Sequence, residues 1–173
     1  GDDFDDLTTV AVPPRGGTPS LAGLAELVAR LRAPGGCPWD RAQTHESLRP
    51  YLLEEAYEVL QALDGDDPAA LGRELGDLML QVVLHAQLAA EAGDFTLPDV
   101  LDAISSKIVR RHPHVFGSAV ADTPAEVRVR WEEVKRLERA GEGRTEGPLA
   151  GLPKALPALA LAQTAQRRLA DSG

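Results

Sequence analysis

The chain has 173 residues and a formal net charge of −9, with 43% apolar residues but only 4% aromatic residues. Such an acidic protein is a poor general ligand for nucleic acid or for an anionic membrane surface. One cysteine, Cys37, cannot form an internal disulfide, and the sequence has no long apolar run or signal-peptide pattern, so we expect a cytoplasmic protein that does not span a membrane.

Helical elements account for most of the predicted chain. Its apolar content comes mainly from Leu, Val and Ala, a mixture that favours helices. We therefore expect an all-α fold, an antiparallel bundle of four to five helices over residues 19–140. Residues 1–18 are acidic and then rich in Pro and Gly, which predicts a flexible leader. Residues 141–173 are expected to form a linker and a C-terminal helix.

The first predicted helix begins near Pro19 or Ser20 and runs to about Arg32, where the sequence Ala-Pro-Gly-Gly stops it. A turn over residues 37–40 follows and presents Trp39 at a loop. Thr44 can start the second long helix, which is expected to reach about Leu63.

Four further signals divide the rest of the chain. Asp67 is a predicted cap for a helix that ends at Gly93. Thr96 and Asp99 form a predicted capping box that opens a helix to about Arg111. A second box at residues 123–126 opens a helix to about residue 139. A polar linker then leads to an Ala-rich stretch over residues 152–169, which is interrupted by two prolines.

Two pairs of acids stand out on the second and third long helices. Glu55 and Glu58 are three residues apart, and so are Glu74 and Asp77. Residues i and i+3 share one face of a helix, so an antiparallel hairpin of these helices would bring the two carboxylate pairs together. A di-iron carboxylate site is excluded at this spacing because it needs Glu-x-x-His pairs.

The residues around these acids point to a metal ion. Leu, Met and Val cover most of the circumference of the third long helix, so its Glu74–Asp77 edge is expected to be at least partly buried. Arg73 alone cannot neutralise the surrounding acids. Oxygen ligands without Cys or His suit Mg2+, with Mn2+ as the alternative. The other interpretation, that the acids form a solvated helix face, stays open at this point.

A family resemblance rests on several motifs together. The pattern EExxE at Glu54, Glu55 and Glu58 is followed, after fifteen intervening residues, by ExxD at Glu74 and Asp77. With the segments GCPWD at residues 36–40 and RRHPHVF at residues 110–116, the chain resembles the MazG family of nucleoside triphosphate pyrophosphohydrolases over roughly residues 21–140.

The resemblance implies a Mg2+-dependent enzyme of nucleotide-pool housekeeping that splits a nucleoside triphosphate into a monophosphate and diphosphate. Glu55, Glu58, Glu74 and Asp77 would hold the metal, and Glu54 would support these ligands or act as the base that orients water. Lys107 and Arg111 would hold the triphosphate.

The same resemblance places Trp131 and Lys135 near the nucleotide, and it implies a homodimer. Two alternatives remain. One is a non-catalytic helical module that binds nucleotides or proteins; the other is a related phosphoribosyl-ATP or dUTP pyrophosphohydrolase. The GCPWD and RRHPHVF segments favour MazG over the latter.

Overall fold

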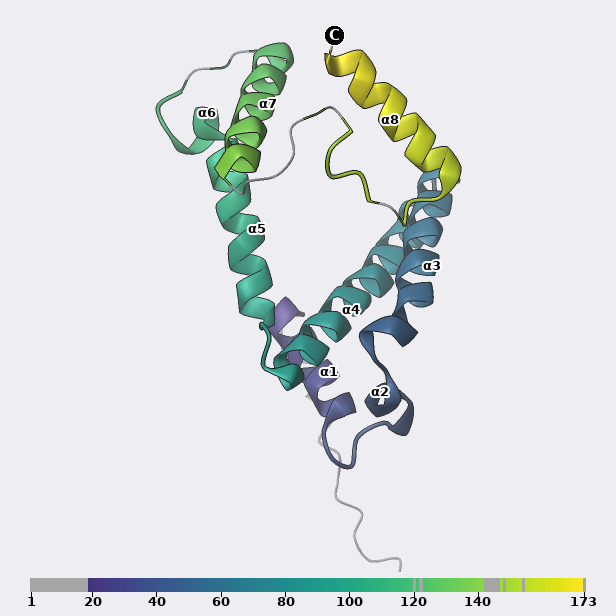
Figure 1. The fold of residues 1–173 in the computed structure, drawn as a ribbon. Helices are drawn as coiled ribbons and strands as arrows, with labels where there is room; N and C mark the ends of the chain where they lie inside the picture. The colour runs from purple at the N-terminus through teal and green to yellow at the C-terminus, as the bar shows by residue number, and fades with distance from the viewer. Residues whose placement is uncertain are drawn as a thin grey trace, which may run out of the picture. The chain divides into compact units, whose positions relative to one another are not determined.

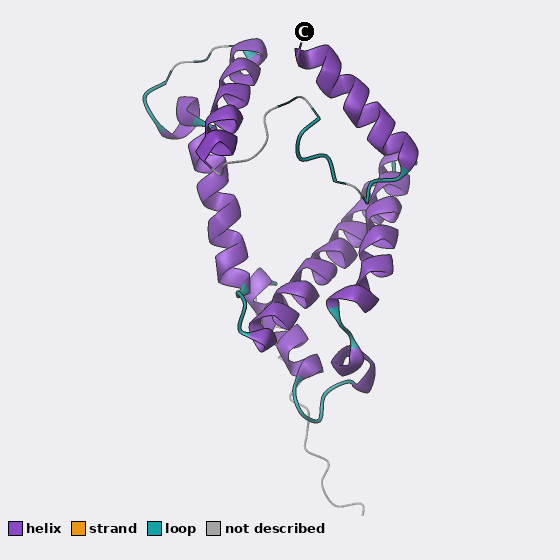
Figure 2. Ribbon diagram, in the orientation of Figure 1, coloured by secondary structure: helices purple, strands orange, loops and turns teal. Residues whose placement is uncertain are grey.

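The computed structural model describes residues 19–119, 121, 123–141, 147, 149–153 and 155–172, and these residues form helices joined by loops (Figure 1, Figure 2). This confirms the all-α prediction. The predicted leader over residues 1–18 and most of the predicted linker lie outside the described residues. Within the described part of the chain, the helices are α1 (Leu21–Arg32), α2 (Pro38–Ala42), α3 (His45–Asp64), α4 (Pro68–Ala92), α5 (Leu97–Arg111), α6 (Pro113–Phe116), α7 (Pro124–Gly141) and α8 (Ala158–Ser172).

The chain forms two compact units, whose boundary lies in α5 between Asp102 and Ala103. The first unit contains α1 to α4 and the start of α5. The second contains the rest of α5 and the three helices that follow. In the part of the chain that the structure describes, no helix is both long enough and apolar enough to cross a lipid bilayer.

An antiparallel hairpin of α3 and α4 is the main element of the first unit, and Figure 1 shows the two helices side by side. Thr44 begins α3 through a capping box, in which Thr44 Oγ1 accepts from Ser47 N and Ser47 Oγ accepts from Thr44 N. Asp67 caps α4 by accepting hydrogen bonds from the N–H groups of Ala69 and Ala70, each 3.0 Å long. Both predicted start points are therefore confirmed.

A small apolar core joins α1 to this hairpin. Its buried side chains are Val28 of α1, Leu48 of α3, and Val83 and Leu84 of α4. Partly buried apolar residues surround them: Leu21, Leu24, Ala25, Leu80, Leu88 and Leu97. The core fixes the position of α1 on α4 and leaves the opposite side of α4 without such cover.

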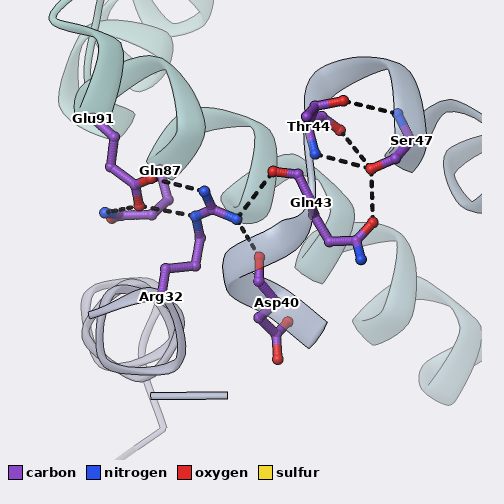
Figure 3. A network of polar contacts seen from close by, with 7 residues as sticks. All are labelled: Arg32, Asp40, Gln43, Thr44, Ser47, Gln87 and Glu91. Atoms are coloured by element: carbon purple, nitrogen blue, oxygen red, sulfur yellow. Dashed lines mark hydrogen bonds and ion pairs between the residues drawn. The ribbon is translucent and has the colours of Figure 1, made fainter. Parts of the chain in front are cut away.

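Arg32 joins three helices at one end of the first unit (Figure 3). Its guanidinium donates two hydrogen bonds of 2.8 Å to the carboxylate of Glu91, near the end of α4. It also donates to the backbone carbonyl groups of Asp40 and Gln43, at the end of α2. The Arg32 side chain is only 6% exposed. This single charged group gives a donor to the Gln43 carbonyl and a second donor to the Asp40 carbonyl, which also accepts from the backbone N–H of Gln43.

Two short helices lie outside the predicted long ones, and the first of them replaces the turn expected near Trp39. Residues 38–42 form α2, and residues 113–116 form α6. Each begins with proline at its first position, where the fixed φ angle suits a helix and the missing N–H costs no hydrogen bond. The predicted end of the first helix is confirmed, because α1 ends at Arg32. Gly36 allows close backbone contact there, because a Cβ at this position would lie 2.2 Å from the carbonyl oxygen of Leu31.

Truncation of the core should lower stability by a predictable amount. Leu48 is 0% exposed, so Leu48→Ala leaves a cavity and is expected to cost about 3 kcal/mol in the free energy of unfolding. Urea denaturation followed by helical circular dichroism measures this loss. Leu159→Ala, at a side chain that is 87% exposed, is the control and should change stability by less than about 0.5 kcal/mol. Equal losses in the two variants would contradict the assigned core.

The Arg32–Glu91 pair should make stability depend on pH. Hydrogen bonds from Arg32, and then from Gln87, hold the pKa of Glu91 below the ordinary value of 4.5. A carboxyl group with a depressed pKa contributes stability that is present above the unfolded-state pKa and is lost as the pH falls through the folded-state pKa.

Glu91→Gln is therefore expected to cost about 1 kcal/mol at pH 7, a modest figure because the carboxylate is partly exposed. The difference from the wild type should shrink as the pH falls below 4.5. Urea denaturation at a series of pH values measures it. Glu26→Gln removes an exposed acid from α1 as the control. A loss that is constant with pH would show that the charge of Glu91 is not responsible.

Candidate functional site

Three of the predicted metal ligands lie together in the first unit. Glu55 and Glu58 project from α3, and Glu74 projects from α4, so that one ligand atom from each lies within 4.8 Å of the other two. Glu55 and Glu74 are partly buried, and Glu58 is exposed. The i, i+3 spacing and the antiparallel hairpin produce this cluster in the way the sequence predicted.

Asp77, the fourth predicted ligand, lies one turn beyond Glu74 and is exposed. It is not one of the three residues whose ligand atoms lie within 4.8 Å of one another. Its negative charge nevertheless contributes to raising the pKa of Glu55. Asp77 therefore lies at the margin of the cluster, and its role as a ligand stays a prediction.

The electrostatics of the cluster are unfavourable without a positive charge. Partial burial raises the pKa of Glu55 first, and the negative charges of Glu58 and Asp77 raise it further. Glu54 is exposed at the neighbouring position and makes a smaller contribution of the same sign. A cation bound among these carboxylates would remove the repulsion.

The burial of α4 differs from the prediction around Glu74 and Asp77. Glu74 is partly buried as expected, but Asp77 is exposed, and so are the large apolar side chains of Leu75, Met79 and Val82, at 49%, 43% and 39%. The reason is that α1 and α3 cover only part of the circumference of α4. An apolar helix surface predicts burial without saying what covers it.

The predicted substrate-binding residues lie on two helices of the second unit. Lys107 and Arg111 are on α5, and Trp131 and Lys135 are on α7. The Arg111 guanidinium lies over the Trp131 ring, 5.5 Å from its centroid. Lys135 forms an ion pair of 2.8 Å with Glu132 on the same helix. The structure thus brings Arg111 and Trp131 into contact, whereas Lys107 is an exposed side chain on the same helix as Arg111.

Two further residues of the second unit, His112 and Glu138, contact Trp131 or Arg111. The ring of His112 meets the Trp131 ring edge to face, with centroids 4.9 Å apart. Glu138 of α7 forms ion pairs with both Arg110 and Arg111. The sequence did not single out Glu138, since no local spacing connects residue 138 with residues 110 and 111.

Comparison with known proteins identifies a family over much of the chain. The family model of the MazG nucleotide pyrophosphohydrolase domain matches residues 43–116. That segment contains the carboxylate cluster as well as Lys107 and Arg111.

Curated relatives match over a longer stretch. A nucleoside triphosphate pyrophosphohydrolase of Escherichia coli K12 is 48% identical over 151 residues, which cover 87% of this chain and 57% of the relative. The nucleoside triphosphate pyrophosphohydrolase/pyrophosphatase MazG of Thermotoga maritima is 43% identical over 151 residues, covering 87% of this chain and 56% of the relative. The chain therefore spans little more than half the length of these two relatives.

A solved structure shows the same likeness in three dimensions. The crystal structure of a mazG-related protein from Thermotoga maritima matches with a TM-score of 0.58 at 29% sequence identity. The match covers 66% of this chain and 98% of that one. The domain match, the curated relatives and the shared fold together show that the chain contains a domain of the MazG family over residues 43–116.

Proposed function

We propose that the chain hydrolyses nucleoside triphosphates to a nucleoside monophosphate and diphosphate. The observation that carries the proposal is the approach of Glu55, Glu58 and Glu74 to within 4.8 Å inside the MazG match. The names of the relatives from Escherichia coli and Thermotoga maritima support it.

The carboxylate cluster fits a divalent metal ion. The donor atoms of Glu55, Glu58 and Glu74 are all carboxylate oxygens, which suit Mg2+ or Mn2+. Burial raises the pKa of Glu55 first, and the neighbouring negative charges of Glu58 and Asp77 raise it further; a cation would relieve both effects. We assign these three residues and Asp77 as the metal ligands. When bound, the ion supplies positive charge for phosphate oxygens and lowers the pKa of a coordinated water.

The other residues act on the substrate in this proposal. Glu54 accepts a proton from the attacking water, whose oxygen bonds to the α-phosphorus as the bond between that phosphorus and the bridging oxygen breaks. Lys107 and Arg111 bind the phosphates and stabilise the charge of the departing diphosphate. Trp131 and Lys135 bind near the nucleoside.

Loss of a single ligand should abolish turnover without unfolding the chain. Glu58→Gln and Asp77→Asn are each expected to lower kcat by about a hundredfold or more, since a metal supplies several kcal/mol of transition-state stabilisation. Diphosphate release from a panel of canonical and damaged triphosphates with Mg2+ measures the effect. Product identification in the same assay separates this activity from that of a phosphoribosyl-ATP or dUTP pyrophosphohydrolase.

Asp64→Asn is the control: it removes an exposed acid from α3, the helix that carries Glu58, and should leave turnover unchanged.

A second measurement does not depend on activity. Mg2+ at ten times its Kd should stabilise the wild type by about 1.4 kcal/mol and the Glu58→Gln variant by less. Near wild-type turnover in either ligand variant would refute the metal assignment, and nucleotide binding without turnover in the wild type would favour a non-catalytic module.

We also propose that the chain forms a homodimer. Large apolar side chains on α3 and α4 are exposed, among them Tyr57, Leu60 and Leu75 at 49%, 52% and 49%, and a second copy could cover such a surface. Size-exclusion chromatography with light scattering should give twice the chain mass of 18.4 kDa at micromolar concentration. A monomer mass would contradict the proposed dimer.

The cytoplasmic location also stays a proposal, based on the single cysteine.

A further inference from the structure

One carboxylate of α7 binds two successive arginines of α5. Oε1 of Glu138 accepts from Nε of Arg110 at 2.7 Å, and Arg110 Nη2 lies 2.7 Å from the same oxygen. Oε2 of Glu138 accepts from Nε and Nη2 of Arg111 at 3.1 and 2.6 Å. Both oxygens are therefore engaged, and the group of three side chains keeps one net positive charge.

The two arginines differ in their exposure to water. The Arg111 side chain is 19% exposed and that of Glu138 is 16% exposed, whereas the Arg110 side chain is 53% exposed. A charge pair that is sheltered from water is screened less than one at the surface. Glu138 should therefore restrain Arg111 more strongly than it restrains Arg110.

Two contacts restrain the Arg111 guanidinium. Glu138 binds one edge of it, through Nε and Nη2. Its Cζ lies over the ring of Trp131, 5.5 Å from the ring centroid. A guanidinium has five N–H donors in a rigid fork, so the two hydrogen bonds to Glu138 leave three donors for other acceptors, such as phosphate oxygens.

We propose that Glu138 is a positioning residue for the substrate: it holds Arg111 against Trp131, so that the remaining edge of the guanidinium is preorganised to bind phosphate. The proposal rests on the proposed function, in which Arg111 binds the triphosphate. Arg111, and then Arg110, hold the pKa of Glu138 below its ordinary value, which keeps the carboxylate charged at neutral pH.

Glu138 could either orient Arg111 for phosphate or compete with phosphate for Arg111, and these two roles predict opposite effects of its removal on substrate binding. If Glu138 orients Arg111, removal of its carboxylate frees a flexible side chain and substrate binding weakens. If Glu138 competes with phosphate for Arg111, its removal strengthens binding. The position of the Arg111 guanidinium over the Trp131 ring and the donors that Glu138 leaves unused favour orientation.

Kinetics of Glu138→Ala and Glu138→Gln test the proposal. Glu138→Ala should raise KM for the triphosphate about tenfold, equivalent to about 1.4 kcal/mol, and Glu138→Gln should raise it less because one acceptor oxygen remains. The kcat of both should fall as well, but by a smaller factor than KM rises, because Arg111 also stabilises the charge of the departing diphosphate in the proposed function. Glu133→Ala removes the same charge from an exposed position of α7 and should leave KM unchanged.

A double-mutant cycle separates positioning from a general structural effect. If Glu138 acts through Arg111, the double variant Arg111→Ala/Glu138→Ala should bind no more weakly than Arg111→Ala alone. Additive losses in the cycle, an unchanged KM in Glu138→Ala, or a lowered KM would each overturn the proposal. Circular dichroism confirms folding, and Glu138→Gln carries the test if the alanine variant is unfolded.

A binding assay distinguishes this proposal from the proposed function. In a Trp39→Phe background, Trp131 is the remaining tryptophan, and its fluorescence reports Kd for a non-hydrolysable triphosphate with Mg2+. Absence of diphosphate release by the wild type would refute the enzyme assignment alone. Binding that is insensitive to Glu138→Ala, or no binding at all, would refute the positioning role.

Discussion

The pairing of α3 with α4 is the constraint on which the candidate site depends. Buried Leu48 on α3 and Val83 and Leu84 on α4 hold the two helices together near one end of the hairpin. The same pairing brings Glu55 and Glu74 together further along, although their charges repel. Apolar burial at one end therefore holds in place an arrangement of acids that would be unfavourable by itself.

Much of this arrangement could be predicted from sequence because its determinants are local. The caps at Thr44 and Asp67 and the stop at Gly93 each depend on side chains within a few residues. The face shared by Glu55 and Glu58 follows from helix geometry alone. Eight helices among the described residues, where four or five long ones were expected in the bundle, reflect short single-turn elements and the helix at the C-terminal end.

What the sequence could not predict depends on contacts between distant residues. The apolar surface of α4 is real, but which parts of it are covered depends on the paths of α1 and α3. Leu75 and Met79 are therefore exposed, although they belong to that apolar surface. Likewise, Glu138 is 27 residues from Arg111 along the chain. Only the fold of α5 and α7 shows that one carboxylate serves two arginines.

The short connection between α3 and α4 has a consequence for how the acidic cluster forms during folding. Only residues 65–67 separate the two helices, so the hairpin closes a small loop at low entropic cost. Contacts between segments adjacent in sequence are the fastest to form in helical proteins. The carboxylates of Glu55 and Glu74 would thus meet early, before the chain beyond α4 has folded, and a divalent ion could bind at that stage.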